Sequence, residues 1–199
     1  MRAALLSLAG AALLVAGLSG GVFAQSLQTL QQRDVSQQQR IENGLQDGSL
    51  NTREAARLEQ DQRNVDKLQA NSLKDGKLSP AERKRIDAAQ ARASRDIHQA
   101  RTNGVKGDAL STSSQRMQAD VQRNINQDKR IAGGVKSGAL DNQKVARLDA
   151  GQARVDGKEA RAGHNGVVGV KEQAGIQHSE NKQSRRIHKL KTNPEVRPS

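Results

Sequence analysis

Two segments of the chain have the spacing of a calcium-binding EF-hand loop. With Gly48 or Gly76 as the sixth of twelve positions, oxygen-bearing side chains fall at positions one, five, nine and twelve. These residues are Asn43, Asp47, Asn51 and Glu54 in the first loop, and Asn71, Asp75, Ser79 and Glu82 in the second. The central glycine, the apolar eighth residue and the final glutamate match the EF-hand pattern. The eight residues are therefore candidate calcium ligands.

Helix capping explains the same residues without a metal. Asn51 with Glu54 and Ser79 with Glu82 have the spacing of a capping box, and Pro80 stands at a first helical position. Position three of each loop is a leucine, which cannot bind calcium, and two carboxylates are few for a site that needs six to eight oxygens. We therefore favour capped helix–turn–helix segments and keep weak calcium binding as the alternative.

The four histidines do not form a metal motif in the sequence. They are His98, His164, His178 and His188. None has a second histidine four residues later, and the chain has no cysteine. A zinc site needs three or four such ligands. We expect partly exposed helical histidines without a metal.

The charge balance points to anionic partners. The chain has 33 Lys and Arg residues against 21 Asp and Glu, a formal net charge of +12. The densest basic stretch supplies the candidate anion-binding residues Lys182, Arg185, Arg186, His188, Lys189 and Lys191. The only aromatic residue is Phe23, which lies within the predicted signal peptide, residues 1–24. The remaining chain has no ring on which nucleic-acid bases could stack, so specific nucleic-acid recognition is not expected. The alternative is a solvated basic face without a ligand.

No catalytic motif is present. The sequence lacks a cysteine nucleophile, G-x-S-x-G, H-E-x-x-H, a P-loop and a dinucleotide fingerprint. Its carboxylates are interspersed with basic residues at helical spacing, which predicts surface ion pairs. We expect a protein that is not an enzyme.

The N-terminus has the pattern of a secretory signal peptide, residues 1–24. Arg2 precedes an Ala-, Leu- and Gly-rich run, and Val22-Phe23-Ala24 has small residues at the −3 and −1 positions of a cleavage site. We expect a periplasmic or secreted protein that does not span the membrane after cleavage. Its core would have to be built from Leu, Ile, Val and Ala, which predicts marginal stability.

An internal duplication divides the rest of the chain. The phrase SRDIHQARTN at 94–103 returns as SRRIHKLKTN at 184–193, and residues 37–103 match residues 127–193 at 22 of 67 positions without gaps. This predicts two tandem units, 25–103 and 115–193, with a linker at 104–114 and a disordered tail at 194–199.

Each unit has the pattern of three helices. Gly48, Gly76, Gly138 and Gly166 each stand two residues before an apolar residue and predict tight turns. The helices are expected near 28–46, 52–73 and 80–102, and again near 113–136, 142–162 and 170–191. The predicted fold is all-α, with two tandem three-helix units built from degenerate EF-hand-like repeats.

The second unit is expected to be looser than the first. Gly151, Gly157 and Gly163 replace residues with side chains in its middle helix, and each interior glycine costs about 1 kcal/mol. Residues 118–193 also carry 15 Lys and Arg against 8 Asp and Glu, whereas residues 28–103 carry 14 against 11.

The segments RDVSQQQRIENGLQDGSLNTREAARLEQDQRNVD (33–66) and LKDGKLSPAERKRIDAAQARASRDIH (73–98) resemble a group of small exported proteins of Gram-negative bacteria with the motif Q-Q-x-R-I-x-x-G-x-x-x-G-x-L. The resemblance covers the first unit and, more faintly, the second, where Lys144 stands in place of Glu54. It implies export and a short helical repeat, and it carries no active site.

These observations favour an exported basic protein that binds anionic envelope components or acts in envelope stress. A weak calcium-binding protein and a structural spacer without a ligand are the two alternatives. The ligand and the oligomeric state do not follow from the sequence.

Overall fold

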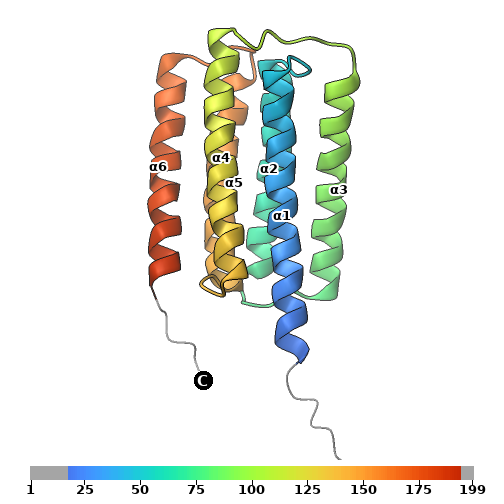
Figure 1. Ribbon diagram of the computed structural model, residues 1–199, viewed down its shortest axis with the longest axis vertical. Helices are drawn as coiled ribbons and strands as arrows, with labels where there is room; N and C mark the ends of the chain where they lie inside the picture. The colour runs from blue at the N-terminus through green and yellow to red at the C-terminus, as the bar shows by residue number, and fades with distance from the viewer. Residues whose placement is uncertain (1–17, 194–199) are drawn as a thin grey trace, which may run out of the picture.

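The computed structural model describes the backbone of residues 18–193 and the side chains of residues 26–193, and within them it is all-α (Figure 1). The helices are α1 (Leu18–Gln46), α2 (Thr52–Leu73), α3 (Pro80–Thr102), α4 (Thr112–Lys136), α5 (Asn142–Gly163) and α6 (Val170–Thr192). The predicted all-α class, with three helices in each unit, is confirmed, whereas the EF-hand-like character of the repeats stays a prediction. Helix α4 begins inside the predicted linker, and α1 begins inside the predicted signal peptide. The rest of that peptide and the predicted tail lie outside the described residues.

The helix boundaries follow from local caps. Asn51 with Glu54 and Ser79 with Glu82 form the predicted capping boxes at the starts of α2 and α3. The turns predicted at Gly48, Gly76, Gly138 and Gly166 all have glycine at positive φ, between 71° and 89°. Other residues rarely adopt this conformation, so glycine fixes the point at which each hairpin reverses.

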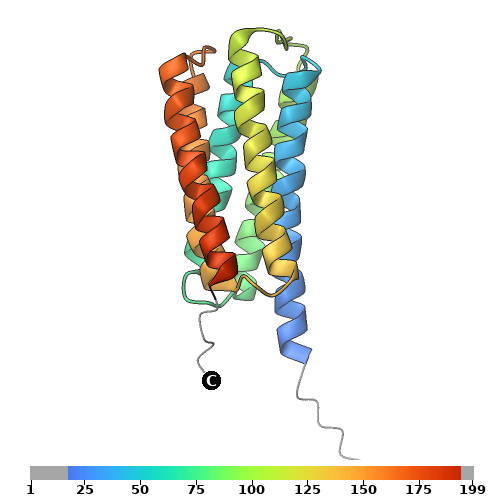
Figure 2. The same cartoon turned by 60° about the vertical axis from the view of Figure 1, so that its left-hand side comes forward.

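The two units form one bundle with a shared core. Helix α4 packs along α1 and runs in the opposite direction, and α5 does the same with α2 (Figures 1 and 2). Helix α3 packs on α1 and α2, and α6 packs on α4 and α5. Contacts repeat at an offset of 90 residues: Arg40 donates to Ser94 Oγ at 2.6 Å, and Arg130 donates to Ser184 Oγ at 2.7 Å. The halves are therefore related by an approximate half-turn.

The apolar core is divided into two clusters, one toward each end of the bundle. The first joins the start of α1 to the end of α2, and the second joins the end of α1 to the start of α2. Members of the first include Leu27, Leu30, Leu73, Ile131 and Leu148, and members of the second include Ile41, Leu45, Ala55, Val121 and Ile125. Both clusters draw residues from both halves. The middle of the bundle is left to polar side chains.

The three glycines of α5 are sites of close contact between helices. All three are buried. A Cβ atom at Gly151 would lie 1.9 Å from Gln183 Oε1, one at Gly157 would lie 2.7 Å from Arg63 Cδ, and one at Gly163 would lie 2.6 Å from Met117 Cε. A larger residue would displace its neighbours, so the low helix propensity of glycine is offset by tighter packing. The greater looseness of the second unit stays a prediction.

Candidate functional site

The middle of the bundle holds a group of buried carboxylates, which we call the polar layer. Its nine acidic members are Asp34, Glu59, Asp66, Asp120, Asp128, Asp149, Asp156, Glu159 and Glu180, each at most 8% exposed. The prediction that the carboxylates lie at the surface is wrong for all nine; only Glu180 forms an ion pair, with its Oε2 3.5 Å from Arg123. Spacing of three and four residues places carboxylates on one face of a helix but does not determine whether that face is buried.

At one end of the polar layer, amide groups donate to the buried carboxylates, and we call it the amide-bonded end. Asp34 accepts hydrogen bonds from Gln69 Nε2, at 2.9 and 3.1 Å, and from Gln90 Nε2, at 2.7 Å. Gln31 Nε2 donates to Asp149 at 3.3 Å. Burial raises the pKa of Asp34 to about 6, although the amides of Gln69 and Gln90 favour its ionised form.

The opposite end, related by the half-turn, has lost these donors. The positions of Gln31, Gln69 and Gln90 are occupied in the second half by Val121, Glu159 and Glu180. We call this end the carboxylate end. Two of the amide donors thus correspond to acids in the second half, and the third corresponds to an apolar residue.

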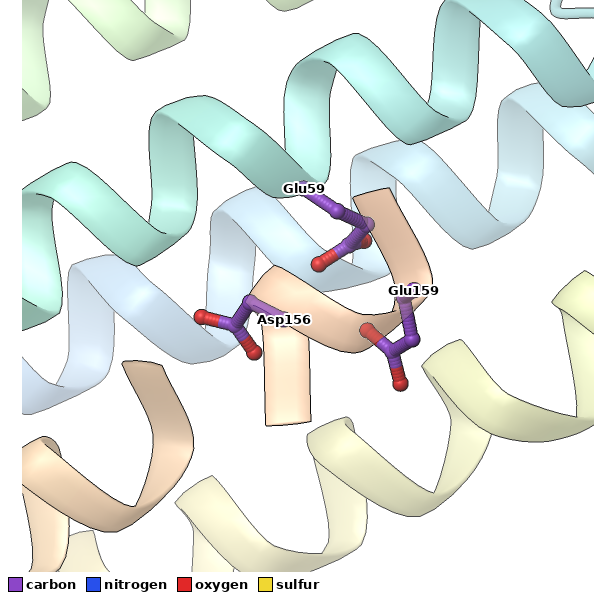
Figure 3. A group of neighbouring side chains, drawn as sticks. All are labelled: Glu59, Asp156 and Glu159. Atoms are coloured by element: carbon purple, nitrogen blue, oxygen red, sulfur yellow. The ribbon is translucent and has the colours of Figure 1, made fainter. Parts of the chain in front are cut away.

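The carboxylate end gathers three acidic side chains from two helices. Glu59 comes from α2, and Asp156 and Glu159 come from α5 (Figure 3). One oxygen of each lies within 4.8 Å of the other two, and no other group of three or more His, Cys, Asp or Glu side chains this close occurs among residues 26–193. Asn124 Nδ2 donates to Glu159 at 2.8 Å, and Gln38 Nε2 donates to Glu59 at 3.1 Å.

The polar layer has more acceptors than donors. Twelve buried side-chain atoms make no hydrogen bond within the described part of the chain, and every one is an oxygen. Nine of the twelve belong to the carboxylate end: one oxygen each of Gln38, Glu59, Asn124, Asp156 and Glu159, and both carboxylate oxygens of Asp120 and Glu180. A buried acceptor without a partner is costly, and a buried charge more so. This end of the bundle therefore needs protons or a cation.

The pKa values of these groups reflect the same deficit. Burial raises the pKa of Glu59 to about 7, although hydrogen bonds with Gln38 and Glu159 act to lower this pKa. Burial and the charge of Asp120 raise the pKa of Glu180 to about 8, opposed by Arg123. The pKa of Glu159 lies well above its usual value because the side chain is buried among Glu59, Asp120 and Glu180.

The eight residues predicted as EF-hand ligands are not part of this group. Glu54 and Glu82 close their capping boxes, and Glu54 also accepts from Asn103 at 2.7 Å. Asp47 pairs with Arg101 at 2.7 Å, and Asp75 accepts from the amide of Lys77. Asn51 and Ser79 accept from the backbone as helix caps. Asn43 and Asn71 are exposed.

Lys144 takes the structural place of Glu54 in the second half. Its Nζ donates to the carbonyl oxygen of Asn193 at 3.1 Å, whereas Glu54 accepts from the side chain of the equivalent Asn103. Lys144 therefore keeps a contact between the start of α5 and the end of α6, as Glu54 does between the start of α2 and the end of α3.

A cationic groove runs between α2, α5 and α6. It has a volume of about 920 Å³, and its lining residues include no carboxylate. Its cations are Arg63, Lys67, Arg154, Lys158, Arg161, Lys182 and Arg186, with His178 beside them. None of the seven forms an ion pair in the described residues. Burial and the nearby charge of Arg186 lower the pKa of Arg154, so like charges are crowded together here.

Two of the six residues predicted to bind anions, Lys182 and Arg186, line this groove. Arg185, His188 and Lys189 are exposed on other parts of α6, and Lys191 is partly buried near its end. The sequence identified the helix but not its groove-facing residues, and it missed the contributions of α2 and α5. All four histidines are exposed, and only His178 adjoins the groove.

The groove has no cationic equivalent in the first half. Arg154, Lys158, Arg161 and Arg186 correspond at the 90-residue offset to Asn64, Leu68, Asn71 and Asp96. Lys182 alone keeps a basic counterpart, Arg92. The positive charge has accumulated on one of two equivalent faces.

No protein-family model, curated protein or solved structure is significantly similar to this chain. Among the helices within residues 18–193, none is both long and apolar enough to cross a bilayer.

Proposed function

We propose that this protein is an exported, non-enzymatic protein that binds an anionic envelope component through the cationic groove. The observation that carries the proposal is the groove itself, which brings seven basic side chains together without a carboxylate. Cations crowded in this way repel one another, and a multivalent anion relieves the repulsion.

The favoured ligand is the phosphorylated head group of lipopolysaccharide. The groove is of the size that binds small molecules and head groups, and arginine recognises phosphate through paired hydrogen bonds. The signal-peptide pattern predicts an envelope location, where this glycolipid is an abundant phosphate carrier. The described residues 26–193 offer no aromatic side chain for base stacking, which argues against single-stranded nucleic acid.

Binding to lipopolysaccharide, with heparin and duplex DNA as comparison anions, tests the proposal. The test variant reverses two charges of the groove, R154E and R186E, and the control reverses two exposed charges of α3 outside it, R85E and R95E. Both doubles change the net charge equally. We expect the groove variant to bind lipopolysaccharide at least about tenfold more weakly, which corresponds to about 1.4 kcal/mol, and the control to change little.

Salt gives a second readout. Wild-type affinity should fall between about 50 and about 500 mM NaCl, because screening weakens contacts between partly exposed charges. Equal losses in the two variants would mean that net charge alone attracts the anion. Tighter binding of heparin or DNA than of lipopolysaccharide would refute the assigned ligand.

A further inference from the structure

The carboxylate end is a separate chemical environment from the cationic groove. Glu59, Asp156 and Glu159 present one oxygen each within 4.8 Å of one another, and none is more than 1% exposed. Each also has one oxygen without a hydrogen bond. Three carboxylates this close repel one another unless protons or a metal ion neutralise them.

A neighbouring side chain provides independent evidence for a ligand. Asp120 is 0% exposed and lies one helical turn before Asn124 on α4, on the face that contacts Glu159. Neither of its carboxylate oxygens has a hydrogen bond in the described residues. Its charge acts on both Glu59 and Glu159. The equivalent residue in the first half is Leu30, so this carboxylate belongs to the second half alone.

At the amide-bonded end, side-chain amides supply donors to the buried carboxylates. There, Gln69 and Gln90 donate to Asp34, and Gln31 donates to Asp149. The carboxylate end has replaced all three donors. We propose that Glu59, Asp156 and Glu159, with Asp120 beside them, bind one hard divalent cation inside the bundle.

The donor set favours a hard divalent cation. All the side chains offer oxygen, with no sulfur or imidazole, and this suits Ca²⁺, Mg²⁺ and Mn²⁺. Oxygens on opposite sides of a Ca²⁺ ion are about 4.6–5.2 Å apart, and about 4.0–4.2 Å apart around Mg²⁺. All three oxygens lie within 4.8 Å of one another, so one ion of this class can contact all three.

Two amides can complete the coordination. Gln38 and Asn124 point their NH₂ groups at Glu59 and Glu159, and each has its own oxygen without a partner. A half-turn of a terminal amide exchanges its oxygen and nitrogen. The carbonyl oxygens of both residues would then face the cation, and their NH₂ groups would give up the hydrogen bonds to Glu59 and Glu159, whose oxygens the cation would bind instead.

Titration of the chelator-treated mature protein with MnCl₂ and CaCl₂ at neutral pH tests this proposal. Free Mn²⁺ is followed by electron paramagnetic resonance, and stability by circular dichroism. We expect about one Mn²⁺ bound per chain and a melting temperature that rises with metal concentration, because a ligand that binds only the folded state stabilises it.

The decisive variant is E159Q, because the first half already carries Gln69 at the equivalent place. It removes a buried charge, so it should fold at least as well as wild type without metal, while its Mn²⁺ affinity falls at least about tenfold. The matched control is D34N, which removes a buried carboxylate from the amide-bonded end and should leave Mn²⁺ affinity within about threefold.

A double variant, E54Q with E82Q, separates the core from the turns. E54Q and E82Q keep the capping-box geometry, since glutamine also serves there, but remove the two EF-hand-like carboxylates. Loss of binding in that variant with retention in E159Q would place the metal in the turns and overturn the proposal. Absence of Mn²⁺ and Ca²⁺ binding in the wild type would mean that protons alone neutralise the carboxylates, and would also overturn it. Neither outcome bears on the anion groove.

Discussion

Replacing Glu180 by glutamine gives the second half the residue that the first half already has at the same place, Gln90. Glu180 is 1% exposed, and its pKa is raised from 4.5 to about 8 by burial and by Asp120, against the attraction of Arg123. Its charge in turn raises the pKa of Glu159. Because the folded state holds this proton more tightly than the unfolded chain does, the free energy of unfolding falls as the pH rises above the unfolded pKa, until the folded pKa is passed.

The magnitude follows from the size of the shift. A rise from 4.5 to about 8 corresponds to about 5 kcal/mol in all. Of this stabilisation, about 3 kcal/mol is lost as the pH rises from about 5 to about 7.5. Glutamine cannot ionise, so over that interval the E180Q protein should gain about 3 kcal/mol relative to wild type, or about 6–12 °C in melting temperature for a domain of this size.

The assay is thermal unfolding followed by circular dichroism, with a chelator present so that only protons are exchanged. The chain has no Trp or Tyr, so fluorescence offers no substitute. D75N, which alters an exposed carboxylate, should give the wild-type pH profile. If the E180Q and wild-type profiles run parallel from pH 5 to pH 7.5, the account of Glu180 as a buried ionising group is wrong.

Other substitutions test the packing and the caps, each by chemical denaturation. G163A should lower stability by about 1–3 kcal/mol because its Cβ has no space, whereas G175A, where nothing lies within 4 Å, should raise it by about 1 kcal/mol; equal effects would contradict this account of the glycines. S79A should cost about 1 kcal/mol through the lost N-cap, and an unchanged midpoint would show that the cap is dispensable. Q69E should destabilise the protein more at pH 8 than at pH 5, because it replaces a donor to Asp34 by a second buried acid; a loss independent of pH would point to packing alone.

The helices were predictable because their signals are local. The capping boxes at Asn51 and Ser79 and the glycines of the turns fix each boundary within a few neighbouring residues, and every predicted helix agrees with the structure apart from the longer start of α1. The antiparallel packing of α1 on α4 and of α2 on α5 was not predictable. It depends on contacts between residues about 90 positions apart, for which a single sequence holds no direct record.

The buried carboxylates were missed although a signal for them is present. Glu59, Gln62, Asp66 and Gln69 follow one another at spacings of three, four and three residues, and Asp149, Gln152, Asp156 and Glu159 repeat the pattern. Polar residues at such spacing normally mark the solvent face of a helix. Here the apolar residues alone are too few to cover both central helices, and the helices fill the middle of the bundle with polar side chains instead.

Covalent linkage of the two units allows each unit to accumulate its own substitutions. If a single three-helix unit associated with a copy of itself through this interface, every substitution would appear twice, on both sides of the symmetry axis. In one polypeptide the two sides are free to diverge. The cationic groove and the carboxylate end both take most of their charged residues from α4–α6, with Glu59, Arg63 and Lys67 from α2, while most of the equivalent positions in the first half are uncharged. The joined chain can thus keep one half as scaffold while the other specialises.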